Sequence, residues 1–213
     1  MAIAYQTLPD GTVQKLAADG VSWETPWPSD PEIALYEKSV ARWESLAVEN
    51  SDRTGVPAPW ILAVIYGESG GNPNAHGPPY DYGIGLMMIT SNSLKQGHSN
   101  AEVFDPGLNV KLGTDFMATN MKLGGTDLPQ NASMFNAGSP GHGAWSSSTA
   151  PWGWREYKIP STGQYPYISK LVRISNYVVS QSVSRTGPPN AAFPPALVFI
   201  GIAFATYLAS RYI

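Results

Sequence analysis

Apolar residues recur at helical spacing along most of the chain. A stripe with a period of about 3.6 residues runs through positions 33–47, behind a capping box made by Ser29 and Glu32, and it predicts a helix that ends near Gly55. The next segment, 60–68, is apolar on nearly every side, which is typical of a helix buried at the centre of a core.

Further helices are predicted downstream. A weak signal begins near Ser91, a stronger one runs from Asp105 to the glycines at 124–125, and apolar stripes cover 132–137 and 165–182. No alternation of apolar and polar residues extends far enough to indicate a strand of any length, and no internal repeat is present. The sequence therefore predicts a mainly α-helical protein.

The chain divides into four predicted parts. Residues 1–28 hold few apolar residues in periodic order and predict an irregular N-terminal arm that packs on another element. Residues 29–183 form the helical domain, and 184–195, with two consecutive prolines, form a linker. Residues 196–213 begin with an uncharged apolar run that suits a short transmembrane helix. The alternative for that run is a helix that packs on the core or on a partner.

Composition excludes several classes of function. The chain has 213 residues and a formal charge of −3, which argues against nucleic acid as a partner. It contains no cysteine, and His76, His98 and His142 lack the spacing of a zinc site, so we predict neither a metal nor a cofactor. The N-terminus has no basic segment followed by an apolar one, so we expect no secretory signal there.

The strongest candidate for chemistry is Glu68, at the end of the predicted central helix. The negative end of the helix dipole and apolar neighbours both disfavour an ionised carboxylate and raise its pKa. A carboxylic acid that stays protonated near neutral pH suits a general acid. Helical spacing alone favours the other interpretation, a surface glutamate at a helix end.

Five motifs, at residues 56–73, 85–89, 105–109, 134–138 and 167–168, together resemble the catalytic domain of the soluble lytic transglycosylases. Residues 56–73 are similar to the start of that domain, where the glutamate of a Glu-Ser pair is the catalytic acid. Four further blocks follow in the family's order within residues 55–175: Gly85-Leu86-Met87-Met88-Ile89, Asp105-Pro106-Gly107-Leu108-Asn109, Met134-Phe135-Asn136-Ala137-Gly138 and Tyr167-Ile168. The resemblance implies a lysozyme-like (goose-type) helical fold.

The same resemblance implies a substrate and a reaction. The substrate is the glycan of peptidoglycan, and the bond is the β-1,4 link from N-acetylmuramic acid to N-acetylglucosamine. Glu68 is implied to protonate the glycosidic oxygen. Its carboxylate then takes the proton from the muramyl 6-hydroxyl, which attacks the anomeric carbon and gives a 1,6-anhydro product.

Departures from the family pattern leave alternatives open. Met88 stands where the family has Gln, and Phe135 where it has Tyr, so two polar sugar contacts are missing. Asp81, in the loop after Glu68, resembles an acidic residue of goose-type lysozymes that helps to position water. A second carboxyl group of this kind would make the enzyme an inverting muramidase. The other interpretation of Asp81 is a turn residue before Gly83.

The predicted substrate-binding residues come from the same blocks. They are Ser69, Met87, Met88, Phe135, Asn136 and Tyr167. Each has a structural alternative: Ser69 bonds local backbone, the methionines belong to the core, Asn136 caps its helix, and Tyr167 is a core tyrosine. A different class of function, a non-catalytic structural virion protein on a lysozyme scaffold, is motivated by the missing Gln and Tyr.

The expected setting follows from the same features. We expect a virion protein, associated with a membrane or tail, that opens the cell wall locally during phage entry. The alternative is a bacterial enzyme anchored by residues 196–213 and facing the wall. The expected partners are peptidoglycan strands, a membrane and other virion proteins.

Overall fold

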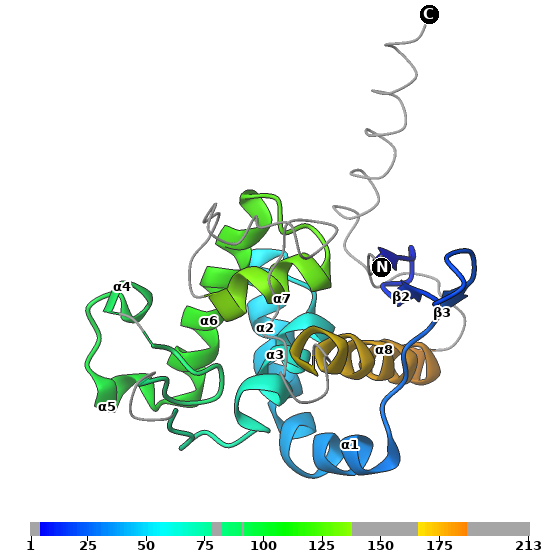
Figure 1. Ribbon diagram of the computed structural model, residues 1–213. Coiled ribbons are helices and arrows are strands. Elements are labelled where there is room, and N and C mark those ends of the chain that lie inside the picture. Colours follow the sequence, from blue (N-terminus) through cyan, green and yellow to red (C-terminus); the bar gives the residue numbers. More distant parts are fainter. Residues whose placement is uncertain (1–4, 78–81, 91, 138–165, 187–213) are drawn as a thin grey trace, which may run out of the picture.

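The computed structural model describes residues 5–77, 82–90, 92–137 and 166–186 (Figure 1). These residues are mainly helical, as predicted. After three short strands the elements are α1 (Asp30–Leu35), η1 (Tyr36–Val40), η2 (Ala41–Trp43), α2 (Glu44–Thr54), α3 (Ala58–Ser69), α4 (Asn92–Lys95), α5 (Asn100–Val103), α6 (Pro106–Lys122), α7 (Leu128–Ala137) and α8 (Pro166–Thr186).

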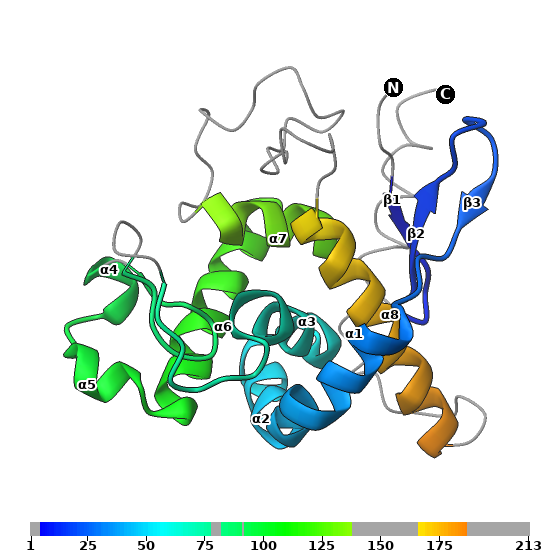
Figure 2. The ribbon, with the colours of Figure 1, turned by 60° about the horizontal axis from the view of Figure 1, so that its bottom comes forward.

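Helix α3 is the centre of the fold, which confirms the prediction for residues 60–68. Every residue from Trp60 to Tyr66 is buried, because α2 and α8 both pack against α3, while α6 packs on α2 and α7 bridges α6 and α8 (Figure 2). Pro57 and Ala58 open the helix, and Gly70 ends it in the left-handed conformation with φ 59°. A helix that is apolar all round needs this position to remove its side chains from water.

The helix predicted from Ser29 to Gly55 is divided into segments. Ser29 and Glu32 form the expected capping box, and the Ser29 amide donates to Glu32 Oε2 at 2.9 Å. After Leu35, which is 42% exposed, the backbone passes through a π-helical segment and a 3₁₀ turn before α2 begins. The wider π turn buries both Tyr36 and Val40. The sequence prediction assumed a constant period of 3.6 residues, so it did not include this change of helix type.

The prediction of an irregular arm over residues 1–28 is wrong for the residues that the structure describes. Strands β1 (Tyr5–Thr7), β2 (Val13–Leu16) and β3 (Trp23–Glu24) form an antiparallel sheet in the order β1-β2-β3. Runs of four residues or fewer are too short for an alternating pattern to be recognised. The arm does pack on another element, because Asn176 of α8 accepts from the Val13 amide at 2.8 Å and donates to the Val13 carbonyl at 2.9 Å.

The remaining helices, except for α5, agree with the predictions apart from their ends. Helix α6 begins after Asp105, whose Oδ1 accepts from the Leu108 amide at 2.8 Å. Helix α7 begins at Leu128, four residues before the prediction, and α8 continues to Thr186, so the predicted linker starts inside a helix. Helix α5 was not predicted, although Ser99 and Glu102 form a capping box, which indicates the start of a helix.

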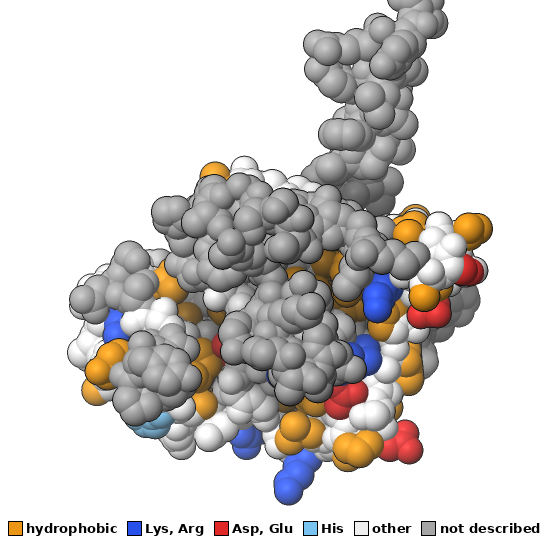
Figure 3. Space-filling view, in the orientation of Figure 1, with side chains coloured by type: hydrophobic (Ala, Val, Ile, Leu, Met, Phe, Trp, Pro, Cys, Tyr) orange, Lys and Arg blue, Asp and Glu red, His pale blue; other side chains and the backbone are white. Residues whose placement is uncertain are grey.

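One face of the described residues is mixed in charge. Lysine, arginine, aspartate and glutamate side chains lie among hydrophobic ones on the face seen in Figure 3. Residues 196–213, predicted to form a hydrophobic helix, lie outside the described residues. Among the helices that the structure describes, none combines the length and the apolar character that a membrane span requires.

Candidate active site

Glu68 lies in the last turn of α3 and is half-buried. The helix reaches this point in close contact with α8: a Cβ atom built on Gly67 would lie 2.4 Å from Leu171 Cδ1 and 3.3 Å from Tyr167 Cε2. Glycine at this position therefore lets the two helix backbones approach where the carboxylate is presented. The Gly70 amide closes the turn with a hydrogen bond of 3.1 Å to the Tyr66 carbonyl.

Tyr167, from the first turn of α8, reaches Glu68 directly. Its phenolic hydroxyl donates a hydrogen bond to Glu68 Oε1. A donor to one carboxylate oxygen fixes the orientation of the carboxyl group and stabilises its ionised form. Residues almost a hundred positions apart in sequence are thus combined into one site.

Lys170 lies one turn further along α8, and the sequence analysis did not single it out. Its Nζ donates to the Gly67 carbonyl at 3.2 Å and lies 5.8 Å from the centre of the Tyr66 ring. Burial lowers the pKa of Lys170 below its ordinary value, while the negative charges of Glu68 and Glu32 oppose that shift. Lys170 follows Tyr167 by three residues on the same helix, and this spacing in the sequence already places both side chains on one face.

Asn109 of α6 holds the segment 83–89 against that helix. The sequence analysis did not predict this role. The Asn109 side chain accepts from the Met87 amide at 2.8 Å and donates to the carbonyls of Ile84 and Val103, both at 2.9 Å. Gly85 allows the contact, because a Cβ there would lie 2.1 Å from Asn109 Nδ2. Asn109 is completely buried, so these bonds are shielded from water.

The two methionines of this segment have different environments. Met87 is completely buried and packs against α6, where a Cβ on Gly113 would lie 2.5 Å from its sulfur. Met88 is half-buried, has φ 48°, and lies over the loop base, since a Cβ on Gly77 or on Gly83 would be 3.1 Å from Met88 Cε. Met87 is therefore a core residue. Of the two methionines, only Met88 has a position that is compatible with a substrate contact.

The two residues predicted from the block at 134–138 also differ in their environments. Phe135 is 8% exposed, and its ring centre lies 5.4 Å from that of Phe116. Its position in the core does not support the predicted substrate contact. Asn136, the next residue on α7, is exposed and stays available to a ligand.

Ser69 has the structural role that its alternative interpretation assigned. Its hydroxyl donates to the Ile65 carbonyl at 3.2 Å and accepts from the Gly71 amide at 3.1 Å, so it closes the end of α3. Asp81, the second predicted acid, lies outside the described residues, although the base of its loop is closed by a bond of 2.7 Å from the Gly77 amide to the Gly83 carbonyl.

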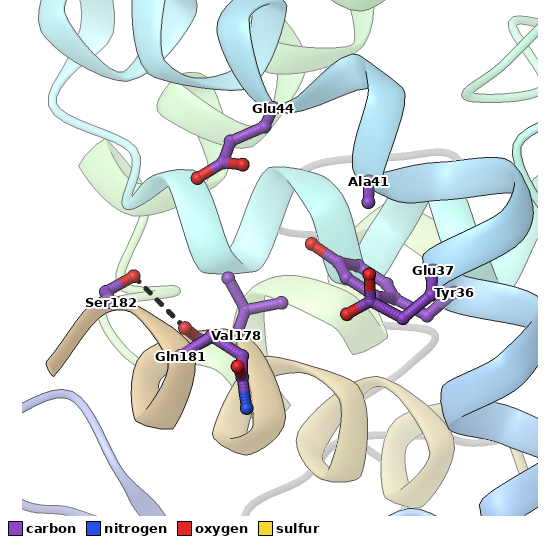
Figure 4. Close-up of a pocket in the computed structure, with 7 residues that line it drawn as sticks. All are labelled: Tyr36, Glu37, Ala41, Glu44, Val178, Gln181 and Ser182. Atoms are coloured by element: carbon purple, nitrogen blue, oxygen red, sulfur yellow. Dashed lines mark hydrogen bonds between the residues drawn. The ribbon is translucent and has the colours of Figure 1, made fainter. Parts of the chain in front are cut away.

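A pocket at the far end of α8 is separate from this site. It is lined by Tyr36, Glu37, Ala41, Glu44, Val178, Gln181 and Ser182 (Figure 4). Glu37 accepts from the Tyr177 hydroxyl at 2.8 Å, and Ser182 donates to the Val178 carbonyl at 3.1 Å. Eleven residues of α8 separate Tyr167 from Val178, which is about 16 Å along a helix. The pocket contains none of the predicted site residues.

Comparison with known proteins decides the family. The sequence model of the transglycosylase SLT domain matches residues 45–153, just over half of the chain. The chain belongs to this family. No curated protein matches the sequence.

Membership of the transglycosylase SLT family makes this chain an enzyme of the lytic transglycosylase class, with peptidoglycan as the substrate of the family. The matched range includes Glu68 and the segments around Met88 and Asn136, but it ends before α8. Tyr167 and Lys170 therefore come from outside the matched range. Through the packing of α8 on α3, Tyr167 reaches the Glu68 carboxyl and Lys170 reaches the Gly67 carbonyl.

Proposed function

We propose that this SLT-family enzyme cleaves the β-1,4 bond between N-acetylmuramic acid and N-acetylglucosamine, with Glu68 as both general acid and general base. The observation that carries the proposal is the hydrogen bond from Tyr167 to Glu68 Oε1, at the end of the buried helix α3. A single oriented carboxyl group is what an intramolecular transglycosylation needs, because it protonates one oxygen and deprotonates another in turn.

The steps balance without water. The protonated Glu68 carboxyl gives its proton to the glycosidic oxygen, and the bond from that oxygen to the muramyl anomeric carbon breaks. The Glu68 carboxylate takes the proton of the muramyl 6-hydroxyl as its oxygen bonds to the anomeric carbon. The products are a 1,6-anhydromuramyl end and a glycan with a free N-acetylglucosamine 4-hydroxyl, and Glu68 is protonated again.

The surroundings of Glu68 suit both halves of this cycle. The C-terminal end of α3 and partial burial favour the protonated acid. The Tyr167 hydroxyl and the nearby Lys170 ammonium favour the carboxylate. The surroundings thus include groups that favour each of the two protonation states that the cycle needs.

The products distinguish this reaction from hydrolysis. Purified sacculi are digested with the full-length protein, and the released muropeptides are analysed by mass spectrometry. We expect 1,6-anhydromuramyl ends, each lighter than the hydrolytic product by one water. Reducing muramyl ends would contradict transglycosylation and favour an inverting muramidase. In that case Asp81→Asn is expected to abolish activity, whereas a transglycosylase tolerates this substitution. The absence of any soluble product would favour the structural role.

We also propose a setting for this activity. The uncharged apolar run within residues 196–213 supports association with a membrane, and a virion that opens the cell wall during phage entry is the context we favour over a bacterial membrane anchor. Mass spectrometry of purified particles tests this context. The protein is expected among the virion components, and its presence only in the membranes of uninfected cells would contradict it.

A further inference from the structure

One face of α8 carries three polar side chains toward α1 and α3. Tyr167, Lys170 and Arg173 follow at intervals of three residues, so they lie along the same side of the helix. Tyr167 bonds the Glu68 carboxyl, Lys170 bonds the Gly67 carbonyl, and Arg173 pairs with Glu32 of α1. The row thus connects the end of α3 to the first helix of the domain.

Arg173 and Glu32 neutralise each other through two hydrogen bonds. Arg173 Nη2 donates to Glu32 Oε1 at 2.5 Å, and its Nε donates to Oε2 at 3.2 Å. Burial opposes ionisation of Glu32, but the bonds from Arg173 and Ser29 outweigh it, and the pKa of Glu32 lies below its ordinary value. This pair therefore stays ionised on both sides, with little net charge toward Glu68.

Lys170 differs from Arg173 because its direct hydrogen bond goes to a carbonyl. The Gly67 carbonyl belongs to the peptide that joins Gly67 to Glu68, at the negative end of the α3 dipole. The ammonium group is thereby fixed beside the backbone that carries the catalytic candidate. Its charge is compensated through space, by Glu68 and by Glu32, rather than by a carboxylate bonded to it.

The interaction of Lys170 with Glu68 acts equally on both groups. The Glu68 charge favours the protonated form of Lys170. By the same Coulomb energy, the Lys170 cation favours the ionised form of Glu68. Other charged and titratable groups on these described elements include Tyr66 on α3, Tyr167, Arg173 and Tyr177 on α8, and Asp30 and Glu32 on α1.

We propose that Lys170 is a positioning residue that holds the end of α3 and stabilises the carboxylate of Glu68 for the base step of the reaction. Its functional meaning rests on the proposed role of Glu68 as acid and base. The effect on Glu68 depends on the positive charge of Lys170. Arginine at this position therefore preserves the effect, and an apolar residue of similar size does not.

The experiment measures the Glu68 carboxyl group itself. The full-length protein, labelled with ¹³C at glutamate side-chain carboxyls, is titrated by NMR, and the Glu68 signal is assigned by its absence in Glu68→Gln. We expect Lys170→Met to raise the pKa of Glu68 by roughly 0.5 to 1 unit, because a nearby cation is lost from a half-buried site. Lys170→Arg is expected to leave it unchanged within about 0.2 units.

Two further variants complete the test. Lys122→Met removes the same charge from an exposed position on α6 and is expected to leave the Glu68 titration unchanged. Lys170→Gln removes the same positive charge but keeps a polar side chain, and it provides a second measurement if Lys170→Met does not fold. An unchanged Glu68 titration in folded Lys170→Met, or in folded Lys170→Gln, would overturn the proposal.

The titration separates two possible failures. If Lys170→Met shifts the Glu68 signal but Glu68→Gln still cleaves sacculi, the electrostatic link stands and the proposed catalytic role fails. If Glu68→Gln is inactive and the signal does not move in Lys170→Met, the catalytic role stands and the role of Lys170 fails.

Discussion

The hydroxyl of Tyr167 donates a hydrogen bond to Oε1 of Glu68, and this contact joins α8 to the end of α3. The two residues are separated by the whole of the segment that carries the other family motifs. Their meeting depends on the close approach of the two helices at Gly67, and on the length of α3 that sets Glu68 in its final turn.

Removing the Tyr167 hydroxyl tests whether the bond contributes to catalysis. Tyr167→Phe keeps the ring but leaves Glu68 without this donor. Since a hydrogen bond to a charged group contributes about 1.5–3 kcal/mol, we expect kcat to fall roughly 10- to 100-fold. Turbidity loss of purified sacculi measures the rate.

A second tyrosine on the same helix provides the control. Tyr177 donates to Glu37 at 2.8 Å in the pocket at the other end of α8. Tyr177→Phe loses a comparable bond and is expected to retain full activity. Equal rates in Tyr167→Phe and the unchanged protein would show that the Tyr167 bond has no catalytic consequence.

Gly67→Ala tests the close approach of α3 and α8. The new methyl group would lie 2.4 Å from Leu171 Cδ1, so either the Leu171 side chain or the helices must shift. Overpacking of this kind costs about 1–3 kcal/mol of unfolding free energy, measured by chemical denaturation. In the double variant Gly67→Ala/Leu171→Ala the cost is expected to be less than the sum of the single changes. Additive costs would show that the two side chains do not meet.

Asn109→Ala tests the buried attachment of segment 83–89. The substitution leaves the Met87 amide and the carbonyls of Ile84 and Val103 without their partner. We expect a loss of about 2–4 kcal/mol in unfolding free energy, because buried backbone groups lose their hydrogen bonds. Hydrogen exchange at the Met87 amide should accelerate as well. A loss below about 1 kcal/mol would contradict this role.

We expect Asp127 to make the stability of the folded state depend on pH. Burial raises the pKa of its carboxyl group, although Oδ1 accepts from the Gln130 amide at 2.8 Å at the start of α7. The folded state therefore binds this proton more tightly than the unfolded state, and stability falls as the pH rises above the ordinary aspartate value and through the raised one. Asp127→Asn keeps an acceptor for Gln130 and removes this loss.

The stability advantage of Asp127→Asn should accordingly be absent at about pH 3 and present at pH 7. Denaturation curves at the two pH values measure it. Asp105→Asn makes the same change at the exposed start of α6 and controls for the loss of one negative charge. A constant difference between Asp127→Asn and the unchanged protein at both pH values would contradict the account.

Sequence patterns predicted the elements that depend on local signals. Continuous apolar character placed α3 at the centre, and the sequence of Asp105 and Pro106 placed the start of α6. Local signals failed where tertiary packing decides the backbone. The short strands of the N-terminal arm depend on Asn176, more than 150 positions away from Val13, and no pattern in residues 1–28 contains that information.

The candidate site shows the same division. Family motifs identified Glu68 and Tyr167, and the structure brings them together. The motifs could not show that Phe135 turns toward Phe116 in the core, or that the Lys170 ammonium reaches the Gly67 carbonyl. Those positions depend on how α6, α7 and α8 pack, which is a property of the whole domain.

The most direct test of the central claim is the activity of Glu68→Gln on purified sacculi, measured by zymography and by release of soluble muropeptides. Glu49→Gln, an exposed change on α2, is the matched control, and circular dichroism verifies that both variants fold. We expect Glu68→Gln to lose at least about 100-fold in rate, because general acid–base catalysis contributes that much or more, while Glu49→Gln stays fully active. Full activity in folded Glu68→Gln would contradict the assignment of Glu68 as the catalytic acid and base.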